Sequence, residues 1–444
     1  MSAKDQIIIP IESPRKRTTD PHDETSGSRV NVLDELKKSK LKEFSNLNKA
    51  EVTSPKIQEV PLLLKDHKNF EKYVKPRVLS LGPIHYGEDQ YKFGEELKLR
   101  LAKKFVEESG KSAEDFCDMI AKKIVQLKEC FDEKVIHRYD NVTLAWMLFV
   151  DGCATLQFIY CAKKGEFKEL NIKNDQVAFG QQDLFLLENQ LPYQLLEELM
   201  ILSTNKELAA SIKSFIDSNN MIHGHNEAGE NEPPIHLLDL LRTSLLDGSM
   251  PSGQDGNNKH ESYRNVQELR AAGIRLKPSK TGLLRNVSFS KRCNFFPGYL
   301  QLPPIRVDDS TGPKFFNLIA YEMCPDFKND FGISSYISLL DSLIDHPDDV
   351  KELRKAHILH NLLGNDEEVA QLFNEIGTDL VPDQATYANV RKQIQNYYDT
   401  KWKTWIAEAI HDHFSSPWTF LAFLAAVTGL GLTAIQTWYT VPWW

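Results

Sequence analysis

Apolar residues recur at helical spacing through most of the chain. Leu184, Leu187, Leu191, Leu195 and Leu199 fall every three or four residues, which is typical of one face of a helix. The same spacing predicts helices over residues 113–130, 144–161, 183–202, 236–246, 315–323, 333–344, 348–363, 366–376 and 384–412. The 144–161 segment is apolar on nearly every side, so it should be buried.

The pattern changes to strand-like alternation between residues 273 and 308. Three segments alternate apolar and polar residues, at 273–279, 286–290 and 299–309. They predict a small antiparallel sheet inserted among the helices. The expected fold class is therefore mainly α, a multi-helix domain with a small antiparallel β insert, followed by one C-terminal transmembrane helix.

The end of the chain has the composition of that transmembrane helix. From Phe414 to Trp444 there is no Asp, Glu, Lys, Arg or His. Residues 417–435 would form a helix about 28 Å long, close to the ~30 Å hydrocarbon core of a bilayer. A buried core helix is the alternative interpretation. The expected anchor residues are Pro417, Trp418, Phe420, Leu421, Phe423, Leu424, Val427, Leu430, Leu432, Ile435, Trp438 and Tyr439.

The expected topology is single-pass and tail-anchored. The only apolar run near the N-terminus, Ile7 to Ile9, is shorter than the core of a signal peptide. The anchor would therefore emerge after translation and leave the N-terminal domain cytosolic, at the plasma membrane or the endoplasmic reticulum. The sequons at Asn141 and Asn286 should then carry no glycan.

Composition divides the chain into three parts. Residues 1–55 are polar and predicted to be disordered, 56–413 form the helical domain, and 414–440 form the anchor. Two polar stretches near 219–233 and 247–262 predict exposed loops. The net charge of −9 argues against nucleic acid as a partner. Six cysteines without a CxxC pair predict reduced thiols.

Polar residues inside apolar runs are the candidate sites. Glu188, Asn189 and Gln190 lie just before Pro192, where one helix should end and the next begin. Glu188 could act as a buried acid, or the three side chains could bond the backbone at the helix break. Asp151 lies within WMLFVDGC. It could be a base near the following cysteine, or it could bond a neighbouring loop or an arginine.

Two further candidates are His85, in the segment GPIHYG, and Asp308, in VDDST. Asp308 could bind a divalent cation or, more simply, cap the helix that follows. The sequence contains no Walker loop, dinucleotide glycine fingerprint, GxSxG elbow or HExxH motif. We therefore assign no catalytic residue, cofactor or metal ligand from the sequence.

Several blocks in a fixed order resemble the plant family known as domain of unknown function 247. Among them are YVKPRVLSLGPIHYG (73–87), DLFLLENQLPYQLLEEL (183–199), HLLDLLR (236–242), ELRAAGIRLKPS (268–279) and FFNLIAYEMC (315–324). The resemblance extends from about residue 57 to 440. It implies a plant membrane-anchored protein without established enzymatic activity. Some relatives are implicated in grass self-incompatibility, which implies recognition or signalling. The family's paired histidine is single here, at His85, which argues against catalysis there.

These observations predict a protein-interaction or signalling module presented at a membrane surface, with the bilayer and a protein as partners. The first alternative is a membrane-associated hydrolase that uses Asp151, Glu188 or His85. The second is an oligomeric channel subunit, which would need its one uncharged helix to line a pore. Convergence of these three residues and Asp308 on one pocket would favour the enzyme, whereas scattering at helix ends would favour the module.

Overall fold

A computed structural model describes residues 55–222, 233–246, 264–291, 297–328, 330–378, 380–383, 385–413 and 417–440. The chain divides into Met1–Thr53 and Ser54–Trp444, and the first of these lies outside the described residues. So do most of the two predicted loops. Three residues of the first loop, Asn219, Met221 and Ile222, are buried, and Ile222 forms a bridge with Ile305. The prediction of an exposed loop is wrong at these three positions.

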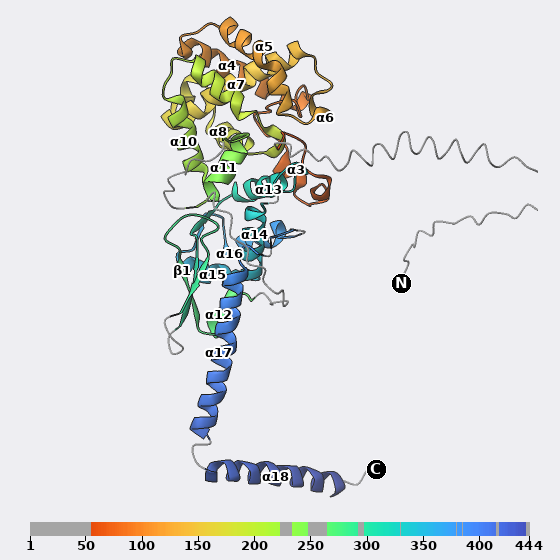
Figure 1. Cartoon of the computed structure of the whole chain (residues 1–444), viewed down its shortest axis with the longest axis vertical. Coiled ribbons are helices and arrows are strands. Elements are labelled where there is room, and N and C mark those ends of the chain that lie inside the picture. The colour runs from red at the N-terminus through yellow and green to blue at the C-terminus, as the bar shows by residue number, and fades with distance from the viewer. Residues whose placement is uncertain are drawn as a thin grey trace, which may run out of the picture. The chain divides into compact units, whose positions relative to one another are not determined.

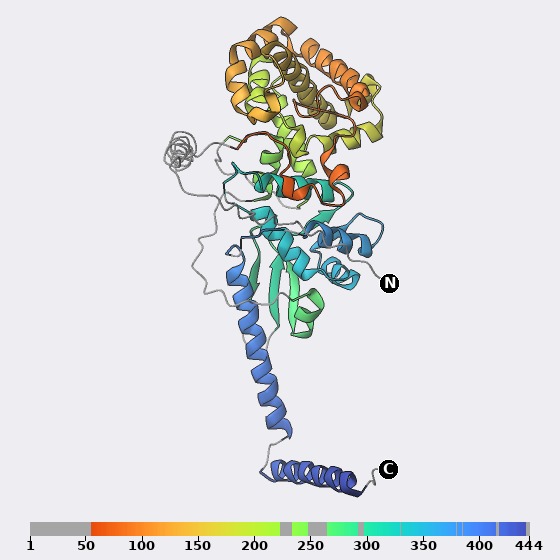
Figure 2. The same cartoon turned by 90° about the vertical axis from the view of Figure 1, so that its right-hand side faces the viewer.

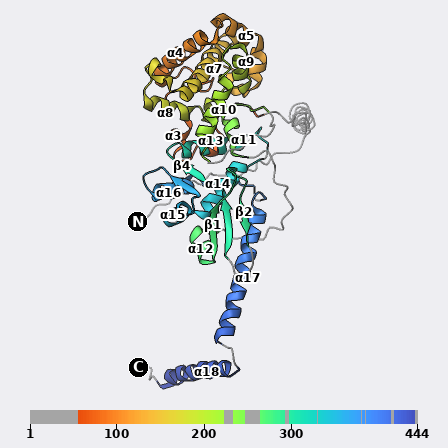
Figure 3. The ribbon, with the colours of Figure 1, turned by 90° about the vertical axis from the view of Figure 1, so that its left-hand side faces the viewer.

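The described residues are mainly helical, with a small β component. The first group of helices surrounds α7 (Asn141–Lys164), which packs against α4, α5, α9 and α10 (Figures 1 and 3). Most of the apolar part of α7 is buried, so the prediction of a buried helix is confirmed. The other α-helices as far as residue 245 are α3 Phe70–Val74, α4 Lys92–Ser109, α5 Ala113–Glu129, α6 Glu133–Ile136, α8 Asn174–Asp183, α9 Tyr193–Leu202, α10 Leu208–Asn219 and α11 Leu237–Leu245, of which α3 and α11 pack against α13 (Thr311–Glu322).

Local sequence explains where α7 begins and ends. The Asp140 carboxylate accepts a hydrogen bond from Thr143 N at 2.7 Å, which satisfies a backbone donor that a first helical turn leaves free. Gly165 follows the last residue with φ of 74°, a left-handed conformation that glycine adopts without steric cost. The helix is held in this position by the tertiary packing of its apolar surface.

The predicted helix over 183–202 is wrong in its first half. Helix α8 ends at Asp183, a short 3-10 turn η4 spans Leu187–Asn189, and α9 begins directly after Pro192. The leucines at helical spacing are nevertheless all buried. The Gln190 side chain donates to the carbonyls of Leu184 and Leu186, so side-chain bonds replace the helical ladder here.

The strands form a mixed sheet in the order β1-β3-β2. Strands β2 (Ser288–Ser290) and β3 (Gly298–Leu302) pair antiparallel, but β1 (Ile274–Pro278) pairs with β3 in parallel. The expectation of a purely antiparallel sheet is therefore wrong. The chain passes from β1 to the far edge before it turns back through β3, so the central strand runs parallel to the first.

A second, two-stranded parallel sheet joins β4 (Ile305–Val307) to β5 (Leu359–Asn361). The predicted helix over 348–363 ends early for this reason. Helix α15 (Pro347–Lys355) stops before His357, whose φ of 57° is incompatible with a right-handed helix. The remaining helices here are α12 Val266–Ala271, α13 Thr311–Glu322, α14 Gly332–Leu343 and α16 Asp366–Ile376.

Two long helices complete the chain. Helix α17 (Ala388–His413) begins next to β2 (Figure 3), and its Tyr397 is buried. Helix α18 (Pro417–Thr440) contains an apolar window, Leu421–Trp438, long enough to cross a membrane (Figure 2). None of that window is buried against the rest of the structure, in contrast to the apolar part of α7.

Candidate functional site

Most of the candidate residues meet at one irregular stretch of backbone, residues 77–88, which we call the 77–88 segment. It connects α3 to the 3-10 turn η2 (Asp89–Tyr91) and contains no helix or strand. Its buried N–H and C=O groups therefore need partners from elsewhere. Side chains from α4, α7, α8 and η4 supply them.

Asp183, at the end of α8, binds the start of this segment. Its carboxylate accepts hydrogen bonds from the backbone N–H groups of Arg77 at 3.0 Å, Val78 at 2.7 Å and Leu79 at 2.9 Å. Burial raises the pKa of Asp183 to about 6, and the three N–H donors oppose that rise. Asp183 is not among the residues predicted from the sequence. The available signal was an acid directly before the apolar run LFLL.

The side chains of Asn189 and Gln190 form hydrogen bonds with backbone groups of two different segments. Asn189 accepts from Leu81 N at 2.6 Å and donates to Leu79 O at 2.8 Å, in the manner of a neighbouring strand. The side-chain oxygen of Gln190, Oε1, accepts a hydrogen bond from Leu238 N at 3.1 Å, which links the end of η4 to the start of α11. Both side chains are nearly inaccessible to solvent.

Asp151 and Lys98 form a buried ion pair between α7 and α4. Asp151 Oδ1 lies 2.6 Å from Lys98 Nζ, and its Oδ2 accepts from Gly82 N at 2.8 Å. Lys98 also donates to Ser80 O at 2.6 Å and pairs with Glu95 at 2.7 Å. Burial opposes the charge on Lys98, but the two carboxylates outweigh burial and raise its pKa. Asp151 thus bonds a neighbouring loop and a lysine.

His85 lies at the end of the 77–88 segment between two carboxylates. Its Nε2 is 3.1 Å from Glu188 Oε2, and its Nδ1 is 3.0 Å from Glu88 Oε1. Glu188 Oε1 also accepts from Val60 N at 2.9 Å. Burial lowers the pKa of His85, but the hydrogen bonds with Glu188 and Glu88 outweigh burial and the net shift is upward.

Asp308 lies apart from this network. Its Oδ1 accepts from Ser310 N at 2.9 Å and from the Ser310 hydroxyl at 2.6 Å, directly before α13 begins at Thr311. His85, Asp151 and Glu188 therefore converge on the 77–88 segment, whereas Asp308 organises the start of a different helix.

The network holds backbone in place. Asp183, Asp151 and Glu188 each accept a bond from a backbone N–H group, and Lys98 and His85 face the carboxylates of Asp151 and Glu188. Cys153, which follows Asp151 on α7, is completely buried, and burial raises the pKa of its thiol. A buried protonated thiol is a poor nucleophile. This geometry is better suited to holding the backbone of the 77–88 segment in place than to activating a substrate.

A second buried charge network joins α11, α13 and the start of α14, and it was not predicted from the sequence. Arg242 on α11 donates through Nε to Glu322 Oε1 on α13 at 3.0 Å and through its terminal nitrogen to Asp330 O at 2.6 Å. Glu322 also accepts from Ile333 N and Ser334 N, both at 2.9 Å, at the first turn of α14. The signal was a lone acid in the apolar run FFNLIAYEMC. Its partner, 80 residues away, could not be found from local pattern.

Comparison with known proteins places the chain in a class that the fold alone does not name. A family model described as a plant protein of unknown function, DUF247, matches residues 57–432. The chain belongs to this family of plant proteins. It is 30% identical over 407 residues to the UPF0481 protein At3g47200 of Arabidopsis thaliana, covering 82% of each chain.

A second relative from Arabidopsis thaliana is the putative UPF0481 protein At3g02645. It is 30% identical over 173 residues, which cover 39% of this chain and 32% of the relative. No solved structure matches the chain significantly.

Proposed function

We propose that this protein is a single-pass, tail-anchored membrane protein whose helical domain presents a protein-binding surface on the cytosolic side. The observation that carries the proposal is the exposure of the apolar window of α18. The exposed fraction of its large apolar side chains ranges from 46% at Leu424 to 72% at Leu430. Water disfavours such a surface, and a bilayer of matching thickness accommodates it.

The sequence around the window supports a bilayer as its environment. The chain from Phe414 onward carries no Asp, Glu, Lys, Arg or His, and tryptophans stand at both ends of the apolar stretch. Eight residues with transfer energies of about −0.3 to −0.6 kcal/mol each favour insertion by roughly 2 to 5 kcal/mol. The alternative of a core helix requires burial, and the window has none in the described structure.

The buried networks support a binding role for the domain. His85, Asp151 and Glu188 are bonded to backbone or to charged partners and fix the 77–88 segment. Such residues stabilise a defined outer surface. No observation on the described residues favours the hydrolase or the channel subunit over this role.

Two experiments test the two parts of the proposal separately. Microsomes from plant cells that express the full chain are washed with high salt and with alkaline carbonate. Retention of the protein in the membrane pellet supports insertion of α18. Release of the intact protein into the supernatant would contradict it.

Proximity labelling then compares the full chain with a truncation after His413. Reproducible neighbours recovered only with the full chain support recognition at the membrane. The same neighbours with both forms would show binding that does not depend on the anchor. No reproducible neighbour with either form would contradict the interaction role.

A further inference from the structure

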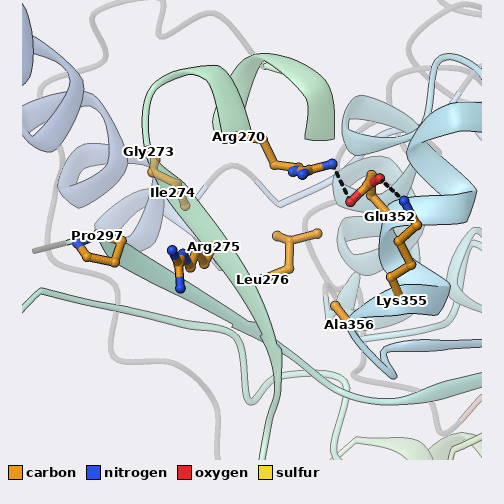
Figure 4. A pocket seen from close by; sticks show the side chains of 9 residues that line it. All are labelled: Arg270, Gly273, Ile274, Arg275, Leu276, Pro297, Glu352, Lys355 and Ala356. Atoms are coloured by element: carbon orange, nitrogen blue, oxygen red, sulfur yellow. Dashed lines mark hydrogen bonds and ion pairs between the residues drawn. The ribbon is translucent and has the colours of Figure 1, made fainter.

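A cavity of about 590 Å³ lies beside the first strand of the sheet, away from the 77–88 segment. Its walls come from the end of α12, the start of β1 and the end of α15 (Figure 4). This volume is within the range of about 300–1,000 Å³ that small-molecule sites occupy. Leu276 and Ala356 contribute apolar surface to the lining.

The cavity carries a surplus of positive charge. Arg270, Arg275 and Lys355 line it together with one carboxylate, Glu352, which leaves two positive charges in excess. The whole chain, by contrast, has a net charge of −9. A local reversal of sign within a cavity attracts anions there more strongly than elsewhere on the surface.

Glu352 positions two of the three cations. It pairs with Arg270 and, at 2.8 Å, with Lys355, and both ion pairs are drawn in Figure 4. The hydrogen bond from Lys355 is the main reason that the pKa of Glu352 is lowered, so this carboxylate is charged at neutral pH. The two side chains are thereby held at the wall of the cavity before any ligand arrives, which reduces the entropy lost on binding.

Arg275 is the third cation, and it differs from the other two. Its side chain is exposed and makes no hydrogen bond or ion pair with the residues that the structure describes. A guanidinium group can donate two parallel hydrogen bonds to the oxygens of a phosphate. Arg275 is therefore the group with unused donor capacity in a cavity that already favours anions.

We propose that this cavity binds the phosphate monoester group of a small organic ligand. A phosphate monoester carries a charge of about −1.5 to −2 at neutral pH, which balances the two excess positive charges. Arg275 binds the phosphate oxygens, and Arg270 and Lys355, which lie across β1 from Arg275 (Figure 4), add longer-range electrostatic attraction. The source is either a soluble phosphorylated molecule or the headgroup of a phosphorylated inositol lipid.

The test measures binding of phenyl phosphate to the purified full chain in detergent by isothermal calorimetry. Detergent makes the result independent of bilayer insertion, so failure here and failure of the anchor are distinguishable. We expect saturable binding, weakened about tenfold or more in Arg275→Ala. Arg275→Lys should bind with intermediate affinity, because an ammonium group keeps the charge but loses the paired geometry.

Lys277→Ala is the matched control, because Lys277 is an exposed cation two residues further along β1 that does not line the cavity. Its affinity should stay within about threefold of wild type. Absence of saturable binding at millimolar phenyl phosphate would overturn the proposal. Equal weakening by Arg275→Ala and Lys277→Ala would also overturn it, since that result indicates general electrostatics.

The source of the phosphate is decided in nanodiscs made with and without phosphatidylinositol 4-phosphate. Weaker apparent binding of phenyl phosphate in the discs that contain this lipid indicates a headgroup that competes for the cavity. Equal binding in both kinds of disc indicates a soluble ligand.

Discussion

The imidazole of His85 contacts the carboxylate of Glu188 at 3.1 Å, and both side chains are more than nine-tenths buried. Through this contact the end of the 77–88 segment is joined to η4, and Glu188 in turn accepts a bond from Val60 N. Three stretches of chain that are far apart in sequence therefore meet at one ion pair, whose strength depends on the protonation of a histidine.

The first prediction is a pH dependence of stability that arises from His85. Its pKa in the folded protein lies above the ordinary value of 6.5, because Glu188 and Glu88 favour the charged ring more strongly than burial disfavours it. The stabilisation is therefore complete below pH 6.5 and is lost as the pH rises through the raised pKa. Urea unfolding at a series of pH values should show wild type losing more free energy above pH 6.5 than His85→Gln.

Asp183 does not obscure this measurement. Its pKa rises from 3.8 to about 6, so stability changes with the ionisation of Asp183 between these two pH values, below the range in which His85 titrates. If wild type and His85→Gln followed parallel curves above neutral pH, the charged state of His85 would contribute nothing to folding.

The second prediction concerns the buried pair of Asp151 and Lys98. Asp151→Ala leaves a buried ammonium group with the partly exposed Glu95 as its remaining carboxylate partner, beside Ser80 O, and it removes the acceptor for Gly82 N. Loss of one partner from a buried ion pair costs about 3 to 5 kcal/mol. Asp151→Asn should cost less, because the amide oxygen can still accept from Gly82.

Denaturant unfolding measures both variants against Asp89→Ala. Asp89 pairs with Lys92 on the surface, where both side chains are at least 79% exposed, so its removal should leave the midpoint unchanged. A midpoint for Asp151→Ala that is as high as for Asp89→Ala would contradict a structural role for the buried pair.

The third prediction concerns the attachment of α17 to the sheet. The Tyr397 hydroxyl accepts from Gly298 N at 3.1 Å and donates to Gly273 O at 3.3 Å. Tyr397→Phe removes both bonds and leaves backbone groups unsatisfied, at a cost of about 1 to 3 kcal/mol. Unfolding experiments and limited proteolysis of α17 should both report the loss.

Tyr398→Phe is the control for that variant. The guanidinium of Arg264 stacks on the Tyr398 ring at 3.8 Å, a contact that phenylalanine retains. Its stability should be close to wild type. Equal proteolysis of α17 in the two variants would mean that the Tyr397 hydroxyl does not hold the helix in place.

The fourth prediction concerns the anchor. Leu424→Asp places a carboxylate within the apolar window, at a cost of roughly 3 kcal/mol, which is comparable to the whole insertion energy. The variant should appear in the soluble fraction after carbonate treatment. Leu424→Ile keeps the apolar surface and should stay in the membrane pellet, and retention of both variants would refute insertion of this helix.

Helices with strong apolar periodicity could be predicted from the sequence, because the residues that define the buried face and the cap lie within the helix or next to it. The bounds of α16 match the predicted 366–376, and Asn365 caps it by accepting from Glu368 N. The apolar pattern reports which side of a helix faces the core, and this property depends on residues within a few turns. The composition of α18 predicts its preference for a bilayer in the same local way.

The sequence alone thus determined the mainly helical class, the apolar C-terminal helix and the family. Only the tertiary structure decided that residues 184–190 leave the helical path, that β1 runs parallel to β3, and that Asp151 pairs with Lys98. Apolar periodicity is a local property of the chain, whereas a buried polar group takes whichever partner the fold brings within about 3 Å. For Asp151, that partner lies 53 residues away on another helix, and no local pattern specifies it.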